Sequence, residues 1–287
     1  DSTGRMWFGT GAGISYLVED CDCIRSLPLD LSGRDVQAAT YIVDALSDGD
    51  GGLWLGTWGE GVVRVPANAW RISRIRPSER RDGLSGERVR ALALDRQAQL
   101  WIGSFGGELL RATAQPLAAL APWSFERILR PGRVDVERAN NIWSMIVDRA
   151  GRVWVGHEAG LDRFDPQSQS WSYFNMASTE RIPGISAIGG SHPIPSGAVR
   201  ALLEAQDGRI WVGTSAGVVV IGVDDQIVPV VDPLSAAGTP IRVRAHSLAE
   251  DPLGRIWIGS SDGLNLLSAQ GQWLTTVGSM PANLPSG

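Results

Sequence analysis

The residues of this chain that could catalyse a reaction are few and scattered. Its 287 residues include only three histidines, His157, His192 and His246. A histidine acts as a general acid or base when a carboxylate or a substrate proton stands within reach, but no His-x-x-x-His or serine-centred motif surrounds any of the three. Glu158, beside His157, is the one acid in a suggestive position. We therefore predict no catalytic residue, no metal site and no cofactor.

Two cysteines, Cys21 and Cys23, are separated by a single residue. Alternate side chains of a strand run parallel, so this spacing disfavours a disulfide. A Cys-x-Cys pair could hold a metal only with further ligands, and none stands nearby in the sequence. A surface turn is the preferred interpretation.

The sequence supports ligand recognition better than catalysis, because arginines, aromatic residues and histidines occupy recurrent positions. Guanidinium forks and aromatic faces suit sugars, carboxylates and phosphorylated small molecules. The alternative for the arginines is simple pairing with acids of neighbouring elements. The predicted ligand-binding residues are Trp58, Arg90, Phe105, Trp143, His157, Arg200 and His246.

These positions recur because the chain is built from a repeat. The stretch DSTGRMWFGT at the start recurs five times, for example as DGDGGLWLGT from Asp48 and DRAGRVWVGH from Asp148. Each copy is anchored by a tryptophan with a glycine two residues later, and the anchors are 47, 47, 53, 57 and 46 residues apart. They are Trp7, Trp54, Trp101, Trp154, Trp211 and Trp257. A fixed period of this length is the mark of propellers and solenoids.

Within each copy the patterns predict four short strands. An alternating apolar run such as VRALALD precedes an Asp-x-x-Gly turn, the tryptophan strand follows, and a glycine turn leads to a third strand such as GLDRFD. A fourth strand is marked by Trp70, Trp123, Trp171 or Trp273. In the turn, the aspartate accepts backbone N–H bonds and the glycine takes a positive φ, whereas the anchor tryptophan is a packing residue between sheets. Four antiparallel strands per repeat make a propeller blade.

The predicted fold is therefore an all-β propeller spanning residues 1–287 as one domain or fragment, with six blade repeats. The first repeat lacks its inner strand. Six repeats fit part of a seven-bladed or tandem propeller, or a six-bladed ring short of one strand. Long insertions at 77–88, 131–141 and 175–197, the last of them a candidate lid, are expected on the same face as the turns that carry Trp58 and Phe105.

The repeat resembles the two-component regulator propeller family. GRVWVGHEAGLDRFD from Gly151 and DGLSGERVRALALD from Asp82 carry the resemblance most clearly, and Ala98 and Ala205 are departures from its turn Gly and turn Asp. The resemblance implies the extracytoplasmic, periplasmic sensor region of an inner-membrane receptor, with a histidine kinase or diguanylate cyclase as output. It implies a non-catalytic propeller whose link to the membrane lies in flanking segments. We expect a homodimer in the full-length receptor.

Composition restricts the partners. Apolar residues make up 43% and charged residues 20% of the chain, which is typical of a folded domain with a buried core. The net charge of −5 provides no basic face for nucleic acid, and no apolar stretch is long enough for a membrane helix. The expected partner is a small molecule such as an oligosaccharide or an organic acid. The alternatives are a propeller that binds proteins, and an enzyme similar to streptogramin lyases or to polysaccharide-processing propellers.

Overall fold

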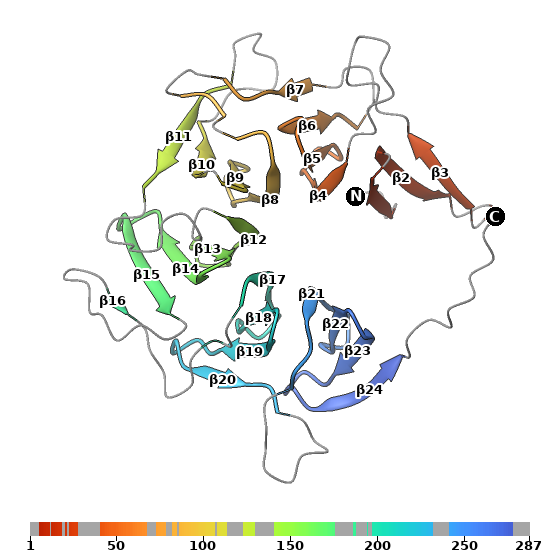
Figure 1. Cartoon of the computed structure of the whole chain (residues 1–287), viewed down its shortest axis with the longest axis vertical. Helices are drawn as coiled ribbons and strands as arrows, with labels where there is room; N and C mark the ends of the chain where they lie inside the picture. The colour runs from red at the N-terminus through yellow and green to blue at the C-terminus, as the bar shows by residue number, and fades with distance from the viewer. Residues whose placement is uncertain are drawn as a thin grey trace. The chain divides into compact units, whose positions relative to one another are not determined.

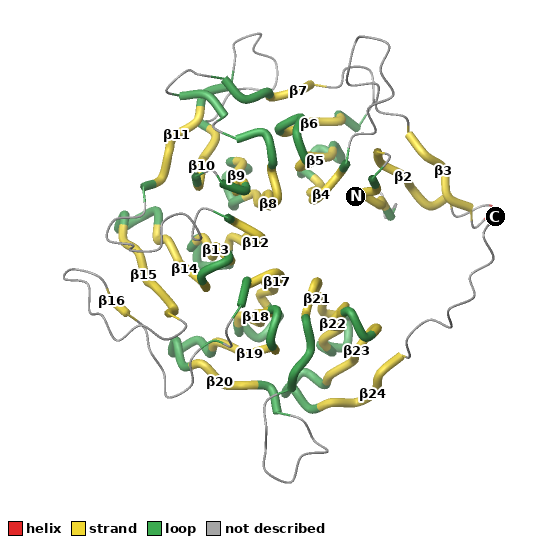
Figure 2. The backbone as a smooth tube through the Cα atoms, viewed as in Figure 1, coloured by secondary structure: helices red, strands yellow, loops and turns green. Residues whose placement is uncertain are grey.

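The computed structural model describes residues 6–11, 13–18, 21, 23–27, 41–67, 73–78, 82–84, 86–106, 108–113, 123–129, 141–175, 186–187, 194, 197–231 and 241–277. The secondary structure in these ranges consists of β-strands joined by turns and loops, as Figure 2 shows. The described residues contain no helix long and apolar enough to cross a membrane. The chain divides into two compact units, Asp1–Ile142 and Trp143–Gly287.

The first unit contains three antiparallel sheets, each formed by strands that follow one another in the chain (Figure 1). The first sheet has only three strands, in the order β1-β2-β3, because no described strand pairs with the free edge of β1. The other two sheets have four strands each. The strands are β1 (Trp7–Thr10), β2 (Gly13–Val18), β3 (Cys23–Leu27), β4 (Ile42–Ser47), β5 (Leu53–Thr57), β6 (Val62–Val65), β7 (Ser73–Ile75), β8 (Val89–Leu94), β9 (Leu100–Ser104), β10 (Leu109–Ala112) and β11 (Phe125–Ile128).

The second unit contains three further sheets of the same design, and its first strand, β12, begins at the boundary between the units. The strands are β12 (Ile142–Val147), β13 (Val153–His157), β14 (Gly160–Asp165), β15 (Ser170–Asn175), β16 (Ser186–Ala187), β17 (Val199–Glu204), β18 (Ile210–Thr214), β19 (Gly217–Ile221), β20 (Ile227–Pro229), β21 (Ala245–Glu250), β22 (Ile256–Ser260), β23 (Gly263–Leu267) and β24 (Trp273–Val277). Successive four-stranded antiparallel sheets are propeller blades. The predicted fold class, an all-β propeller of antiparallel blades, is confirmed.

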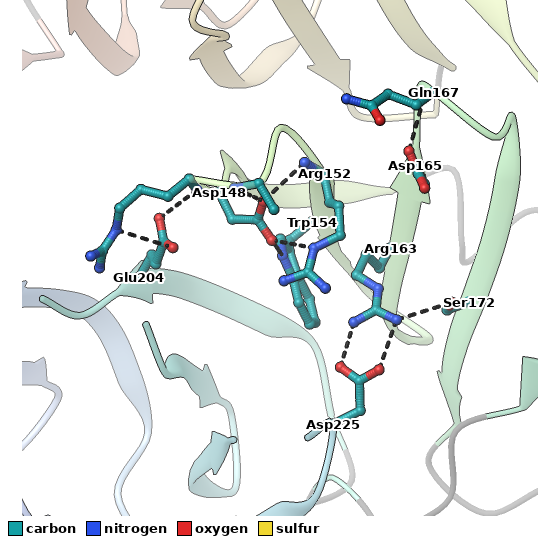
Figure 3. A network of polar contacts seen from close by, with 11 residues as sticks. Asp148, Arg152, Trp154, Arg163, Asp165, Gln167, Ser172, Glu204 and Asp225 are labelled. Carbon is teal, nitrogen blue, oxygen red and sulfur yellow. Dashed lines mark hydrogen bonds and ion pairs between the residues drawn. The ribbon is translucent and has the colours of Figure 1, made fainter. Parts of the chain in front are cut away.

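The Asp-x-x-Gly turn between the first and second strands is held by its aspartate. In the fourth blade, Asp148 Oδ1 accepts the backbone N–H groups of Ala150 and Arg152, each at 2.9 Å. Its other oxygen, Oδ2, accepts the Arg152 side chain at 2.7 Å and the indole N–H of Trp154 at 2.8 Å (Figure 3). Asp95 and Asp251 hold their own tryptophans in the same way. One carboxylate therefore caps the turn and also fixes the anchor tryptophan.

In five of the six repeats, the glycine two residues after the anchor tryptophan lies against the inner strand of the next blade. Gly259 of the last repeat instead meets Ser247 of its own blade. A Cβ atom added to Gly156 would stand 2.6 Å from Val199 Cγ1 and 2.8 Å from the Val199 carbonyl oxygen. A Cβ atom on Gly213 would stand 2.8 Å from Ala245 Cβ. Neighbouring blades of one unit thus approach so closely at this position that only glycine fits.

The anchor tryptophans build the core between blades, as predicted from their repetition. Trp54 packs with Leu92, Leu110 and Phe125 of the following blade. Trp154 and Trp211 likewise belong to apolar clusters made largely by the fifth and sixth blades, respectively. Trp101 is also buried, whereas Trp7 and Trp257 are half-buried. Burial of these large side chains is the main apolar contribution to blade packing.

The expectation that Cys21 and Cys23 do not form a disulfide was wrong. Cys21 and Cys23 form a disulfide with a Cα–Cα distance of 5.1 Å. The argument from strand alternation does not apply, because Cys21 lies in a turn before β3 and only Cys23 belongs to the strand.

Parts of the predicted long loops lie outside the described residues, as does Trp70. Two parts of the 175–197 insertion are described and neither was expected. Ser186–Ala187 forms β16, which pairs in parallel with β15 and adds a fifth strand to the fourth blade. Ile194 is buried in the core cluster around Trp154. These parts of the insertion pack onto the blades, and the prediction of a lid stays untested.

Candidate ligand-binding residues

A β-bulge presents one side chain at the start of the inner strand in four blades. The register between inner and second strand shifts at Val43, Arg90, Arg200 and His246, each of which is the extra residue. A bulge turns its side chain away from the regular alternation of the strand. We call these four residues the bulge residues.

Fifteen positions after each bulge residue, the chain carries a residue of the turn that follows the second strand. Three of these pairs are in direct contact: Arg90 with Phe105, Arg200 with Ser215, and His246 with Ser261. The repeat therefore places two variable side chains side by side at an equivalent point of the third, fifth and sixth blades. The turn residues are Trp58, Phe105, Glu158, Ser215 and Ser261.

In the first unit, three of the predicted residues come together in one cluster. The rings of Trp58 and Phe105 are 5.8 Å apart between centroids. The Arg90 guanidinium carbon lies 4.7 Å from the Trp58 centroid and 5.4 Å from that of Phe105. Arg88, two residues earlier on the same side of the chain, also lies over Trp58, at 4.9 Å. We call Trp58, Arg88, Arg90 and Phe105 the aromatic–arginine cluster.

The exposure of this cluster makes it available to a ligand. Trp58 is 38% exposed, which is unusual for a tryptophan of this chain. Arg88 is exposed, and the neighbouring Tyr41, whose carbonyl accepts the Trp58 backbone N–H, is 57% exposed. Cations stacked on aromatic faces provide both charge and a flat apolar surface. The arrangement suits a planar or ring-shaped ligand with acceptor groups.

In the second unit, two further predicted residues meet. The Arg200 guanidinium carbon lies 4.2 Å from the Trp143 ring centroid, and its Nε donates to Ser215 Oγ at 3.1 Å. Partial desolvation and the positive charge of Arg244 lower the pKa of Arg200, and the carboxylate of Glu158 opposes this effect. Arg200 nevertheless stays protonated at any physiological pH, because an arginine titrates far above neutrality.

His157 has a different place from the one expected. It is fully buried, its Nδ1 accepts the backbone N–H of Ala159 at 3.1 Å, and its Nε2 lies 3.1 Å from Asp162 Oδ2. Thr57 and Thr214 occupy the same position in their blades and also accept a turn N–H. His157 therefore closes a turn from inside, and the next residue, the half-buried Glu158, occupies the turn position predicted for His157.

His246 lies at the bulge position, as predicted, and is exposed. Its Nε2 is 2.9 Å from Ser261 Oγ. His192 lies outside the described residues. Among the residues that the structure does describe, no group of three or more His, Cys, Asp and Glu side chains could hold a metal ion.

Sequence reasoning missed Arg88, Arg244 and the bulges themselves. Arg88 could have been found, because it stands two residues before Arg90 and alternate residues of an extended chain share a side. Arg244 stands two residues before His246 in the same way, so the repeat places it beside that bulge residue. Its effect on Arg200 of the preceding blade depends on how the two blades pack, which the sequence does not show.

Two segments of the chain, residues 137–159 and 193–216, match the family described as Two component regulator propeller. Each segment combines an inner strand with the tryptophan strand that follows it. The class of protein is therefore a β-propeller, and two of its segments match two-component regulator propeller repeats, the family that the sequence resembles. No protein with a curated description matches the chain in sequence.

Solved structures with similar folds come from different functional classes. The extracellular domain of the hybrid two component system BT3049 from B. thetaiotaomicron is 20% identical with a TM-score of 0.69, over 93% of this chain and 32% of that one. The corresponding domain of BT4673 from the same organism is also 20% identical, with a TM-score of 0.68 over 99% and 33%. Virginiamycin B lyase from Staphylococcus aureus, solved in a catalytically inactive form with quinupristin, is 13% identical with a TM-score of 0.68 over 96% and 81%.

At these identities the similarity shows the fold alone. The chain spans about a third of the length of the two sensor domains that it matches.

Proposed function

We propose that this chain is the ligand-sensing, extracytoplasmic propeller of a bacterial membrane receptor and is itself non-catalytic. The observation that carries the proposal is the pairing of variable bulge and turn residues on an otherwise repeated framework, with an exposed aromatic–arginine cluster at one such pair. A repeated scaffold that varies mainly at one presented position is the usual arrangement of a recognition surface.

Two further observations support the extracytoplasmic part of the proposal. The Cys21–Cys23 disulfide fits an oxidising compartment, because cytosolic thiols are kept reduced. The family match and the two similar sensor domains, which are described as extracellular, point the same way. A histidine kinase or diguanylate cyclase as output is the expectation that follows from the family.

The proposal that the chain is non-catalytic rests on the positions of His157 and His246. His157 is engaged inside a turn and reaches no solvent. His246 contacts a serine, without a carboxylate partner among the described residues. The similar fold of virginiamycin B lyase does not favour an enzyme, because a fold can carry unrelated functions.

A thermal-shift screen of the chain against oligosaccharides, organic acids and peptides tests the proposal. A binding compound raises the melting temperature in proportion to the logarithm of its concentration. We expect such a compound among the oligosaccharides or the organic acids, and we expect Trp58→Ala to abolish the shift in melting temperature. Leu274→Ala, which changes another side chain that is 51% exposed, is the matched control and should leave the shift intact.

Two results would contradict this expectation. A shift that survives in the Trp58→Ala variant would place binding elsewhere. Shifts with peptides alone would replace the small-molecule sensor with a propeller that binds proteins.

A further inference from the structure

Arg200 is held in a fixed orientation while its terminal nitrogens stay available. Trp143 lies against one face of the guanidinium, 4.2 Å away, and Ser215 takes the Nε hydrogen. Neither terminal nitrogen donates to an acceptor among the residues that the structure describes, and no described carboxylate forms an ion pair with this side chain. The two nitrogens form a fork whose geometry matches a carboxylate.

Other positively charged or ionisable groups gather around this fork. Arg244, on the extended segment that leads into β21, is exposed and has no described ion-pair partner. Its charge is close enough to affect Arg200. His246 occupies the equivalent bulge position on β21, the strand that lies next to β17. Glu158 is the acid whose charge acts on Arg200 in the opposite direction.

Two arginines brought together cost electrostatic free energy unless an anion offsets their repulsion. Most other described arginines of the second unit are neutralised within the fold, among them Arg152 by Asp148, Arg163 by Asp225 and Arg255 by Asp251 (Figure 3 shows the first two pairs). The exposed Arg242 has no ion-pair partner among the described residues. Arg200 and Arg244 are exceptions as well. The pattern therefore resembles a binding site more than a stabilising network.

We propose that Arg200, Arg244 and His246 form an anion subsite that binds a carboxylate group of a small ligand, with Arg200 as the bidentate partner. This inference rests on the proposed sensing function and names one chemical group of a ligand that binds the second unit. Arg244 supplies a second positive charge, and His246 supplies a hydrogen-bond donor at the edge of the subsite.

Isothermal titration of the 287-residue chain with succinate tests the subsite, and succinamide serves as the neutral probe of the same shape. We expect succinate to bind and succinamide not to bind. Arg200→Gln and Arg244→Gln should each weaken succinate binding about tenfold or more, since each removes a charge-assisted contact. Arg242→Gln is the matched control: Arg242 is an exposed arginine two residues from Arg244, and its charge is not among those that act on Arg200. It should change the affinity less than about twofold.

Several results would overturn the subsite. They are the absence of succinate binding, equal binding of succinamide, or an Arg242→Gln effect as large as that of Arg244→Gln, which would indicate diffuse attraction only. Titrations with inorganic sulfate and inorganic phosphate separate carboxylate recognition from general oxyanion binding, and tighter binding of either would contradict the assignment. If a neutral sugar shifts the melting temperature and succinate does not bind, the subsite fails while the sensing function stands.

Discussion

At the scale of single residues, the turn aspartate has two tasks in the third, fourth and sixth blades, and the fifth blade shows what happens without it. Ala205 stands where the other repeats carry aspartate. Trp211, fully buried, has no acceptor for its indole N–H among the described residues. An unsatisfied buried donor costs stability, because its hydrogen bond to water is lost on folding.

The variant Ala205→Asp should restore this missing bond. By analogy with Asp148 and Asp251, the new carboxylate is expected to accept the Trp211 indole and two turn N–H groups, and to raise the free energy of unfolding by about 1 kcal/mol. Urea unfolding measures the change. Asp251→Ala, which takes the equivalent acceptor from Trp257, is the matched reverse variant and should destabilise the chain. A less stable Ala205→Asp variant would show that the fifth blade has adapted to alanine.

Ala98 gives a second residue-scale prediction. It replaces the turn glycine of the third blade and has a φ of 58°, a left-handed conformation that costs a residue with a Cβ atom about 1 kcal/mol. Ala98→Gly should therefore stabilise the chain by up to about that amount, less the entropy that glycine gains on unfolding. Gly151→Ala, at the same point of the next blade with a φ of 83°, should have the opposite effect on the urea midpoint. Equal midpoints for all three proteins would contradict the argument.

At the scale of the strand, the glycine after the anchor tryptophan sets how closely blades approach. Gly156→Ala adds a methyl group against the backbone and side chain of Val199 in the next blade. Overpacking of this kind costs about 1–3 kcal/mol, so thermal unfolding should occur at a clearly lower temperature. Gly49→Ala is the control, because a Cβ atom there meets no atom within 4 Å. A normal melting temperature for Gly156→Ala would mean that the blades can separate without loss.

The sequence predicted the strands well, because the repeat displays each of them five or six times and every copy supports the others. It was less successful where a copy departs from the pattern. His157 stands where other blades have threonine or serine, and its different residue type made an internal position look like an exposed one. The disulfide was missed because strand alternation was extended beyond the start of β3, into the turn at Cys21. The bulges leave no signature in a sequence whose apolar alternation continues on both sides.

At the scale of the whole chain, ligand recognition by side chains on a rigid framework explains these observations together. The turn aspartates, the glycines and the buried tryptophans fix the blades, and the bulge and turn residues vary on them. In the proposed receptor, a ligand changes the output only if it binds two arrangements of the protein with different affinities. A single propeller and a homodimer in the full receptor stay predictions of the sequence.

Hydrogen–deuterium exchange of the chain, with and without the strongest compound from the thermal-shift screen, tests the central claim most directly. The account predicts that bound ligand slows exchange in the turns after the tryptophan strands, at residues 57–61 and 104–106 for the aromatic–arginine cluster and at 214–217 for the anion subsite. Protection confined to the outer strands β3, β20 and β24, or equal exchange with and without the compound, would contradict the claim that these turns form the recognition surface.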